Sequence, residues 1–128
     1  MSIDDVKILK ERALKFLKNA EFLFENGVYD LAAFNAQQFV ELYLKYKLFL
    51  MAGEYPKTHS LKRLLREIGK ISGKEREVLS FLEENIDRIA NLENAYITAR
   101  YFPTEFERKE VENMLEVAKK IKEFVDEL

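Results

Sequence analysis

The sequence contains no cysteine and no tryptophan, and it has only one histidine, two prolines and four glycines. Without cysteine the chain can form neither a disulfide framework nor a thiolate metal site, which fits a reducing cytoplasm. A single histidine excludes a Cys/His nucleophile pair and a His-rich metal centre. The four glycines are isolated from one another, so no glycine-rich phosphate loop is present. We therefore expect neither a metal nor a cofactor.

A strong charge of one sign is also absent. The net charge is −2, so the whole molecule has no global attraction to nucleic acid. The first ten residues lack the apolar core of a signal peptide. The most apolar stretch, residues 29–52, is too short and too charged to span a membrane. These features predict a cytoplasmic protein without a membrane segment.

Helical periodicity dominates the rest of the chain. Apolar residues recur at intervals of three and four, and no segment has the alternation of a strand. The predicted helices cover about residues 6–24, 29–52, 58–69, 75–99 and 107–125. The sequence thus predicts an all-α protein of a single domain, residues 1–128, built as an up-and-down four-helix bundle with one additional short helix.

Several residues mark the ends of these helices. Ser2 or an early aspartate can cap the first helix, and glycines 27 and 53 can end the first and second helices in a left-handed conformation. The tetrapeptides Ser72–Glu75 and Thr104–Glu107 have the form of capping boxes, which would begin the last two helices.

The stretch Tyr29–Ala52 is apolar on all sides, as expected for a central, largely buried helix. Four polar residues share one narrow stripe of it: Gln37, Gln38, Glu41 and Lys45. Buried polar groups need partners, which the stripe can find in a core network between helices or across an interface. The sequence leaves both interpretations open.

The charged residues are distributed unevenly along the chain. Residues 57–76 contain seven cations and two carboxylates, whereas residues 104–128 contain eight carboxylates and five cations. The basic segment is either a solvated helix face or a patch that meets phosphate or an acidic partner. His59 either helps to cap and cover the third helix or donates a hydrogen bond where phosphate is favoured.

The end of the fourth predicted helix combines a cation with aromatic side chains. Its residues are Tyr96, Arg100, Tyr101, Phe102 and Pro103. They either close the apolar end of the bundle or form a stacking and charge platform for a base or nucleotide.

Three motifs, in this order along the chain, resemble those of the HEPN (higher eukaryotes and prokaryotes nucleotide-binding) domain family. The first is the central helix, with Asp30-Leu-Ala-Ala-Phe-Asn-Ala36-Gln37-Gln38 continuing to Glu41 and Lys45. The second is the loop of Gly53, Pro56 and Thr58-His59-Ser60-Leu61, followed by Leu64 and Leu65. The third is Tyr96 with Ala99-Arg100-Tyr101 and Pro103, in which Phe102 interrupts the usual Arg-Tyr-Pro of the family.

The resemblance implies an all-helical bundle, commonly a homodimer, encoded beside a minimal nucleotidyltransferase. Many members of the family are RNA-cleaving toxins of toxin–antitoxin pairs, and these carry an arginine four to six residues before a histidine. The positions that would hold this arginine before His59 are Ala52, Gly53 and Glu54. The resemblance therefore points to the branch of the family without the nuclease motif, and an enzymatic activity is not expected.

Three functional hypotheses follow. In the first, the chain is a non-catalytic module that dimerises, pairs with a minimal nucleotidyltransferase and binds a nucleotide or RNA. Its candidate binding residues are His59, Lys62, Arg63, Tyr96, Arg100 and Tyr101. In the second, it is an RNase toxin of a toxin–antitoxin pair with a displaced site made of Glu41, His59 and Arg100. In the third, it is a structural dimerisation domain, with the polar stripe of the central helix satisfied across the interface.

Overall fold

The computed structural model describes residues 2–103 and 105–128, and it contains only helices in these ranges. The helices are α1 (Ile3–Glu25), α2 (Tyr29–Ala52), α3 (Leu61–Ser72), α4 (Glu75–Glu84), α5 (Ile86–Tyr101) and α6 (Arg108–Asp126). The predicted all-α class is confirmed. The described part of the chain has six helices, because the predicted long fourth helix is divided in two.

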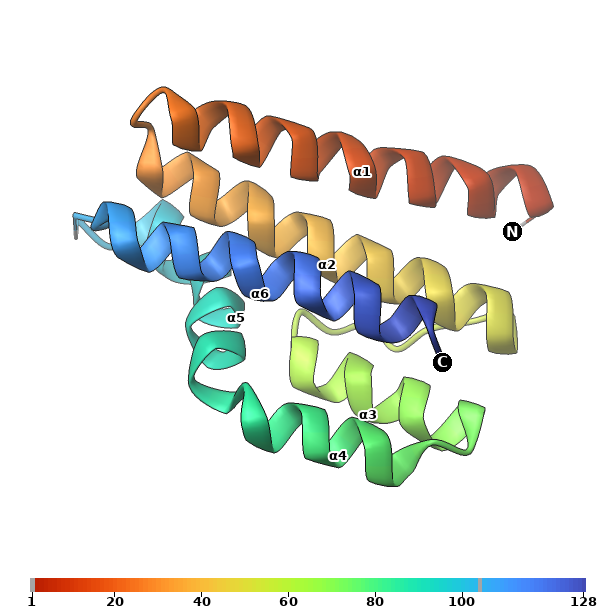
Figure 1. The fold of residues 1–128 in the computed structure, drawn as a ribbon. Coiled ribbons are helices and arrows are strands. Elements are labelled where there is room, and N and C mark those ends of the chain that lie inside the picture. The colour runs from red at the N-terminus through yellow and green to blue at the C-terminus, as the bar shows by residue number, and fades with distance from the viewer. Residues whose placement is uncertain (1, 104) are drawn as a thin grey trace.

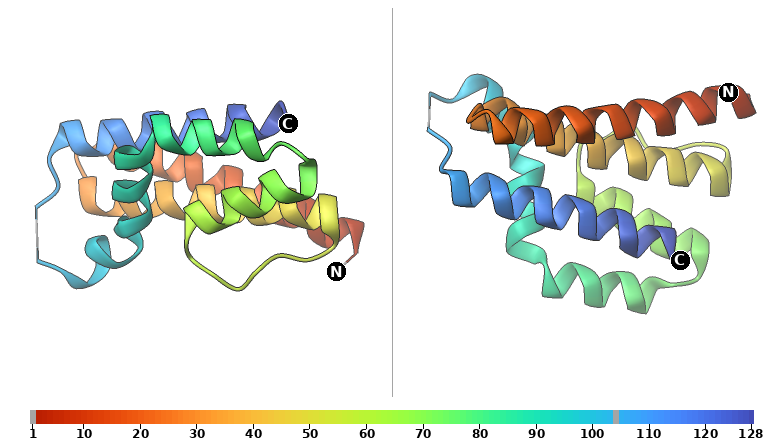
Figure 2. Two further views of the ribbon diagram at one scale, coloured as in Figure 1. Left: turned by 90° about the horizontal axis from the view of Figure 1, so that it is seen from below. Right: turned by 45° about the horizontal axis from the view of Figure 1, so that its top comes forward.

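Helix α2 is the centre of the molecule and packs against α1, α3, α5 and α6. Helices α1, α2 and α6 lie side by side, and α3 and α4 form a helical hairpin next to them (Figure 1). Helix α5 crosses the direction of α2 and α6 (Figure 2). This crossing distinguishes the architecture from a simple up-and-down bundle, and it brings α5 over the first half of α2.

The hydrophobic core draws side chains from all six helices. Its largest fully buried members include Phe39 and Leu44 of α2, Leu65 of α3, Ile89 of α5 and Ile121 of α6. Complete burial of such a side chain contributes about 1.5–3 kcal/mol to folding. The apolar, all-round pattern of α2 is therefore explained by neighbours on most of its circumference.

The predicted start of α1 and the predicted end of α2 are both confirmed. Ser2 accepts a hydrogen bond from the Asp5 amide, and the Asp5 carboxylate accepts one from the Ser2 amide, which forms a capping box at α1. Gly53 ends α2 in a left-handed conformation with φ of 75°. A residue without Cβ adopts this conformation at little cost, so the chain turns sharply here.

The predicted helix over residues 75–99 is wrong in one respect, because it breaks at Asn85. The Asn85 side-chain amide donates to the Phe81 carbonyl at 2.8 Å, and the backbone leaves the helical region at φ −120° and ψ 17°. Asparagine side chains compete with the helical backbone for hydrogen bonds, which favours a helix end at this residue. The direction of the chain changes there, and α5 begins.

Two predicted helix starts need correction. Helix α3 begins at Leu61, not at Thr58, because Ser60 is its N-cap and accepts from the Arg63 amide. The predicted box at Ser72–Glu75 does not form, because Ser72 ends α3 and its hydroxyl donates to the Gly69 carbonyl. Helix α4 starts after Lys74 without a side-chain cap.

The start of α6 is capped differently from the prediction. The predicted box at Thr104–Glu107 includes residue 104, which lies outside the described residues. Glu107 is the N-cap and forms a capping box with Glu110, whose carboxylate accepts from the Glu107 amide at 3.0 Å.

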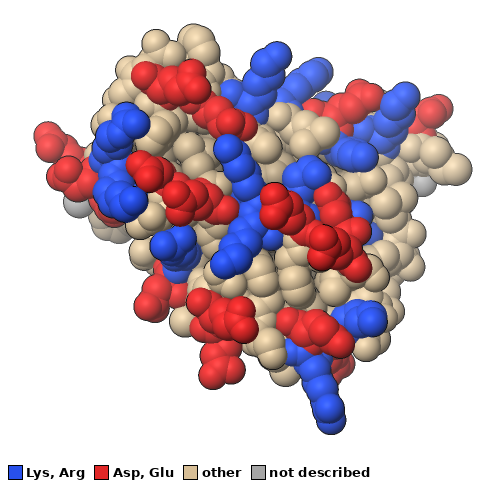
Figure 3. Space-filling model, viewed as in Figure 1, with Lys and Arg blue, Asp and Glu red and all other residues tan. Residues whose placement is uncertain are grey.

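The described residues contain no membrane-crossing helix, and the face drawn in Figure 3 carries charges of both signs. None of their helices combines the length and apolarity that crossing a lipid bilayer requires. The face in Figure 3 carries Lys and Arg side chains interspersed with Asp and Glu, so neither sign dominates it.

Candidate functional site

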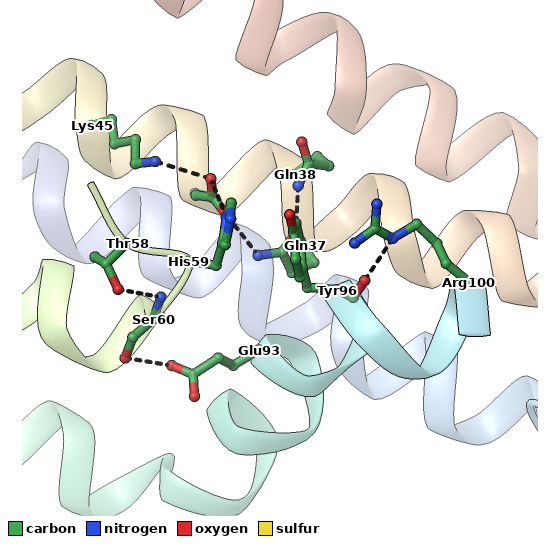
Figure 4. Close-up of polar contacts among 10 residues, drawn as sticks. Gln37, Gln38, Lys45, Thr58, His59, Ser60, Glu93, Tyr96 and Arg100 are labelled. Atoms are coloured by element: carbon green, nitrogen blue, oxygen red, sulfur yellow. Dashed lines mark hydrogen bonds and ion pairs between the residues drawn. The ribbon is translucent and has the colours of Figure 1, made fainter. Parts of the chain in front are cut away.

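The polar stripe of α2 is satisfied by contacts within the chain. The carboxylate of Glu41, which is only 6% exposed, accepts from Gln37 Nε2 at 3.0 Å and from Lys45 Nζ at 3.1 Å. Gln38 Nε2 in turn donates to Gln37 Oε1 at 2.7 Å (Figure 4). A buried carboxylate requires such partners, because desolvation of an unpaired charge costs several kcal/mol. The stripe is therefore a hydrogen-bonded network centred on Glu41.

His59 joins this network from the loop between α2 and α3. Its Nδ1 lies 3.0 Å and 3.2 Å from the two carboxylate oxygens of Glu41. A carboxylate accepts, so Nδ1 carries the hydrogen, and Nε2 is left on the far side of the ring. The His59 side chain is 55% exposed. Glu41 thus orients an imidazole whose second nitrogen is available to a ligand.

The loop that carries His59 is fixed at both sides of this residue. The Ser60 amide donates to the Thr58 hydroxyl at 3.1 Å. The Glu93 carboxylate of α5 accepts from the Ser60 hydroxyl at 3.0 Å and from the Lys62 amide at 3.2 Å. A carboxylate at the first turn of α3 is favoured by the exposed amides and by the helix dipole. Glu93 therefore joins α5 to the start of α3 and holds the loop in place.

One turn further along α5, Tyr96 stacks on the imidazole of His59, with ring centroids 3.9 Å apart and an angle of 20° between the planes. The guanidinium carbon of Arg100 lies 4.2 Å from the centroid of the same tyrosine ring. His59 and Arg100 lie on either side of Tyr96 in Figure 4. The imidazole of the loop residue His59 and the phenol and guanidinium of α5 therefore form a layered arrangement.

Arg100 is held in an aromatic surrounding. Besides Tyr96, its guanidinium lies 5.0 Å from the Phe34 ring centroid and 4.8 Å from that of Tyr101. Its Nε donates to the Tyr96 carbonyl at 2.8 Å. Cation–π contacts of this kind stabilise and orient a guanidinium by about 0.5–2 kcal/mol each. No carboxylate of the described residues forms an ion pair with Arg100, so its two terminal amino groups remain available for an anion.

The structure brings together four of the six predicted binding residues: His59, Tyr96, Arg100 and Tyr101. The other two have different contacts. Lys62 Nζ is 3.9 Å from the Glu93 carboxylate, and Arg63 lines a separate groove together with Glu67. No group of three or more His, Asp or Glu side chains in the described ranges is arranged to hold a metal ion.

Sequence reasoning missed two residues of this site, Glu93 and Phe34. Glu93 precedes Tyr96 by three positions, so the helical spacing placed it on the same side of α5. Phe34 is contributed by α2, and no local pattern indicates that it meets Arg100. Only the crossing of α5 over α2 brings Phe34 and Arg100 into contact.

The comparisons with known proteins agree with the motifs. The HEPN domain family profile matches residues 6–128. The chain belongs to the HEPN domain family.

Two solved structures resemble this HEPN domain. The protein TT1696 from Thermus thermophilus superposes with a TM-score of 0.71 at 28% sequence identity, covering 95% of this chain and 96% of that chain. ST0689, described as an archaeal HEPN homologue, superposes with a TM-score of 0.65 at 21% identity, covering 95% of both chains. A search of curated proteins finds no significant match.

Proposed function

We propose that this HEPN domain is a non-catalytic nucleotide-binding module that dimerises and pairs with a minimal nucleotidyltransferase. The observation that carries the proposal is the set of contacts around the Arg100 guanidinium. Its guanidinium is held by three aromatic rings and one carbonyl, has no acidic partner among the described residues, and stands beside the oriented imidazole of His59.

Phosphate is the ligand that this arrangement fits best. A guanidinium presents paired N–H donors that match two phosphate oxygens, and an ordered side chain loses less entropy when it binds. The Nε2 of His59 adds a second donor when it carries a hydrogen, and Tyr101 adds an exposed aromatic ring on which a base can stack. RNA and mononucleotides share this phosphate and base chemistry.

Exposed apolar side chains near the cluster support the dimer. Leu31 and Phe34 lie one turn apart on α2, and Ile97 and Arg100 lie one turn apart on α5. Leu31 and Ile97 are 46% and 50% exposed, although both are large and apolar. Large apolar side chains gathered beside a functional cluster are typical of protein interfaces. A second copy of the chain would cover them.

One observation favours RNA cleavage as a second candidate function. The His59 ring and the Arg100 guanidinium lie 3.9 Å and 4.2 Å from one ring centroid, so they are less than about 10 Å apart, within reach of one substrate. Glu41 orients His59 as a carboxylate orients a general base, and Arg100 could neutralise the charge of a phosphate. Incubation of purified protein with labelled RNA, compared with the His59→Ala variant, distinguishes cleavage from binding.

The direct test of binding is calorimetric titration of ATP into the purified protein and into three variants. Arg100→Ala and His59→Ala should each weaken ATP binding about tenfold or more, because each removes a charged or polar phosphate contact. Arg76→Ala is the matched control, since it removes an exposed cation from α4, away from the cluster. Absence of heat at millimolar ATP would contradict nucleotide binding and favour a structural dimerisation domain.

Association with the partner needs its own test. A minimal nucleotidyltransferase co-expressed with this chain should co-purify and co-elute with it in gel filtration. If the two proteins elute separately at micromolar concentration, the pairing part of the proposal is wrong, whatever the calorimetry shows.

A further inference from the structure

An open cleft lies beside His59, between the last turns of α2 and the loop that follows them. Its volume is about 520 Å³, and its lining comprises Lys45, Phe49, Gly53, Glu54, Tyr55, Lys57, Thr58 and His59. The cleft exists because Gly53 turns the chain sharply, so that the loop returns alongside α2 as far as Glu41. Its volume lies within the range of small-ligand sites, about 300–1,000 Å³.

The charge of this cleft is balanced, in contrast to Arg100. Lys45 forms an ion pair with the buried Glu41, so it contributes no free positive charge. Lys57 and Glu54 both line the cleft and carry opposite charges. A phosphate would gain little here, whereas it would gain a full ionic contact at Arg100. The cleft is therefore suited to the uncharged part of a ligand.

Aromatic rings and free polar groups provide the contacts that such a part would need. Phe49, Tyr55 and His59 offer ring surfaces, and Lys45 Nζ lies 5.5 Å from the Tyr55 centroid. Glu54 forms no hydrogen bond or ion pair among the residues that the structure describes. The Thr58 hydroxyl accepts from the Ser60 amide and keeps its own hydrogen to donate. Rings with a few unpaired donors and acceptors fit a base and a ribose.

The geometry points to this cleft as a nucleoside subsite, with the phosphate of the same ligand at Arg100. The inference rests on the proposed nucleotide-binding function and deepens it. His59 belongs to both parts, since it lines the cleft and stacks on Tyr96, whose ring also contacts Arg100. The base and ribose enter between Tyr55 and His59, Glu54 accepts from ribose hydroxyls or a base amine, and the phosphate lies across Tyr96.

The test separates the two halves of the ligand. The four nucleoside 5′-monophosphates are titrated first, and the one that binds most tightly is compared with its nucleoside and with inorganic tripolyphosphate. Binding is followed by the backbone amide resonances of Gly53 and Thr58 and by the Nε–H resonance of Arg100. The nucleoside should shift Gly53 and Thr58, and tripolyphosphate should shift Arg100.

Variants assign the contributions of the two parts. Tyr55→Leu keeps apolar volume but removes the ring, and we expect it to weaken the nucleoside and the monophosphate equally, about tenfold, while tripolyphosphate binding is unchanged. Phe22→Leu is the matched control, because it removes an exposed ring from α1. Glu54→Gln, at an exposed residue, gives a second variant whose folding does not depend on the packing of Tyr55.

The outcomes separate the failure of this inference from the failure of the proposed function. If the nucleoside shifts the amides of α5 near Tyr101 and leaves Gly53 and Thr58 unchanged, the base binds elsewhere and the inference is overturned. The same holds if Tyr55→Leu and Glu54→Gln both retain full affinity while Arg100→Ala loses it. If neither ATP nor any of the four monophosphates binds, the proposed function itself is wrong.

Discussion

On the side of α2 that packs against α6, Tyr43 donates a hydrogen bond to Asp126, and two lysines contact the same carboxylate. Lys47 Nζ and Lys122 Nζ lie 3.1 Å and 2.8 Å from its oxygens. Burial by itself raises the pKa of Asp126, but hydrogen bonds from Lys122, Tyr43 and Lys47 outweigh it and lower the pKa from 3.8 to about 2. Burial, together with the bond to Asp126, raises the pKa of the Tyr43 phenol, which therefore stays protonated as a donor.

This cluster predicts a loss of stability in acid. The pKa of Asp126 is lower in the folded state, so its contribution is complete above about pH 4 and is lost as the pH falls through about 2. Asp126→Asn should lower the free energy of unfolding by about 1 kcal/mol at pH 7, and this difference should disappear below about pH 2. Urea unfolding at several pH values measures both quantities.

Glu83→Gln is the control for the acid experiment, since Glu83 is an exposed carboxylate of α4 without a hydrogen bond or ion pair among the described residues. Its unfolding free energy should follow that of the wild type at every pH. If Asp126→Asn retains the complete acid dependence of the wild type, the cluster does not stabilise the fold as described.

At the scale of single residues, the sequence could identify candidate site side chains, but it could not identify every residue that these side chains contact. The stripe around Glu41 and the aromatic residues near Arg100 could be predicted, because helical spacing places them together. The contact of Tyr43 with Asp126 could not, because the two residues lie 83 positions apart and meet only through the packing of α6 on α2. No local pattern encodes that proximity.

At the scale of elements, the long periodic helices were predictable and some of their ends were not. The bounds of α2 follow from an uninterrupted apolar pattern that ends at Gly53. The division at Asn85 was missed, because apolar spacing continues through it on both sides. The capping box expected at Ser72 was wrong because Gly73, in a left-handed conformation with φ of 74°, is the C-cap of α3, and Ser72 is therefore the last residue of that helix.

The contact between α3 and α4 predicts an effect of substituting Gly69. A Cβ at this position would lie 3.1 Å from two side-chain atoms of Val78, which is 1% exposed and would have to shift by a few tenths of an ångström. Alanine normally stabilises a helix interior by about 1 kcal/mol relative to glycine. Here we expect Gly69→Ala to destabilise the protein by about 1–2 kcal/mol, because overpacking outweighs that gain.

A double-mutant cycle in chemical denaturation checks the Gly69 prediction. Val78→Ala removes Cγ2, one of the two Val78 atoms that the new Cβ would meet, so the two substitutions together should cost about 1 kcal/mol less than the sum of their separate effects. Additive effects, or a stabilised Gly69→Ala variant, would show that the α3–α4 contact is not tight.

At the scale of the whole molecule, the crossing of α5 over α2 assembles the site and leaves apolar side chains uncovered beside it. The motifs of the sequence predicted the family and the helical class, both of which are confirmed. The crossing direction of α5 could not be read from the chain, because it depends on the break at Asn85. The contact between Phe34 and Arg100 depends on the same crossing.

This arrangement predicts that a charged side chain introduced beside the site prevents dimerisation. Ile97→Lys places an ammonium among the apolar side chains that a second copy would cover, and burying it unpaired is costly. We expect a dimer for the wild type and a monomer for Ile97→Lys in sedimentation equilibrium at micromolar concentration.

Leu79→Lys is the control for the dimer, since Leu79 is 53% exposed on α4, next to the groove between α3 and α4. It should remain dimeric. A monomeric wild type, or loss of the dimer in Leu79→Lys alone, would place the interface elsewhere or exclude it.

Binding of a nucleotide at the cluster of His59, Tyr96 and Arg100 can be measured directly through the single histidine of the chain. The Cε1–H resonance of His59 is followed while ATP is added to the wild type and to Arg100→Ala. We expect a saturable shift, with the dissociation constant found by calorimetry, and a strongly weakened response in the variant. Saturable ATP binding that leaves the His59 resonance unchanged, or an equal response in Arg100→Ala, would contradict binding at this cluster.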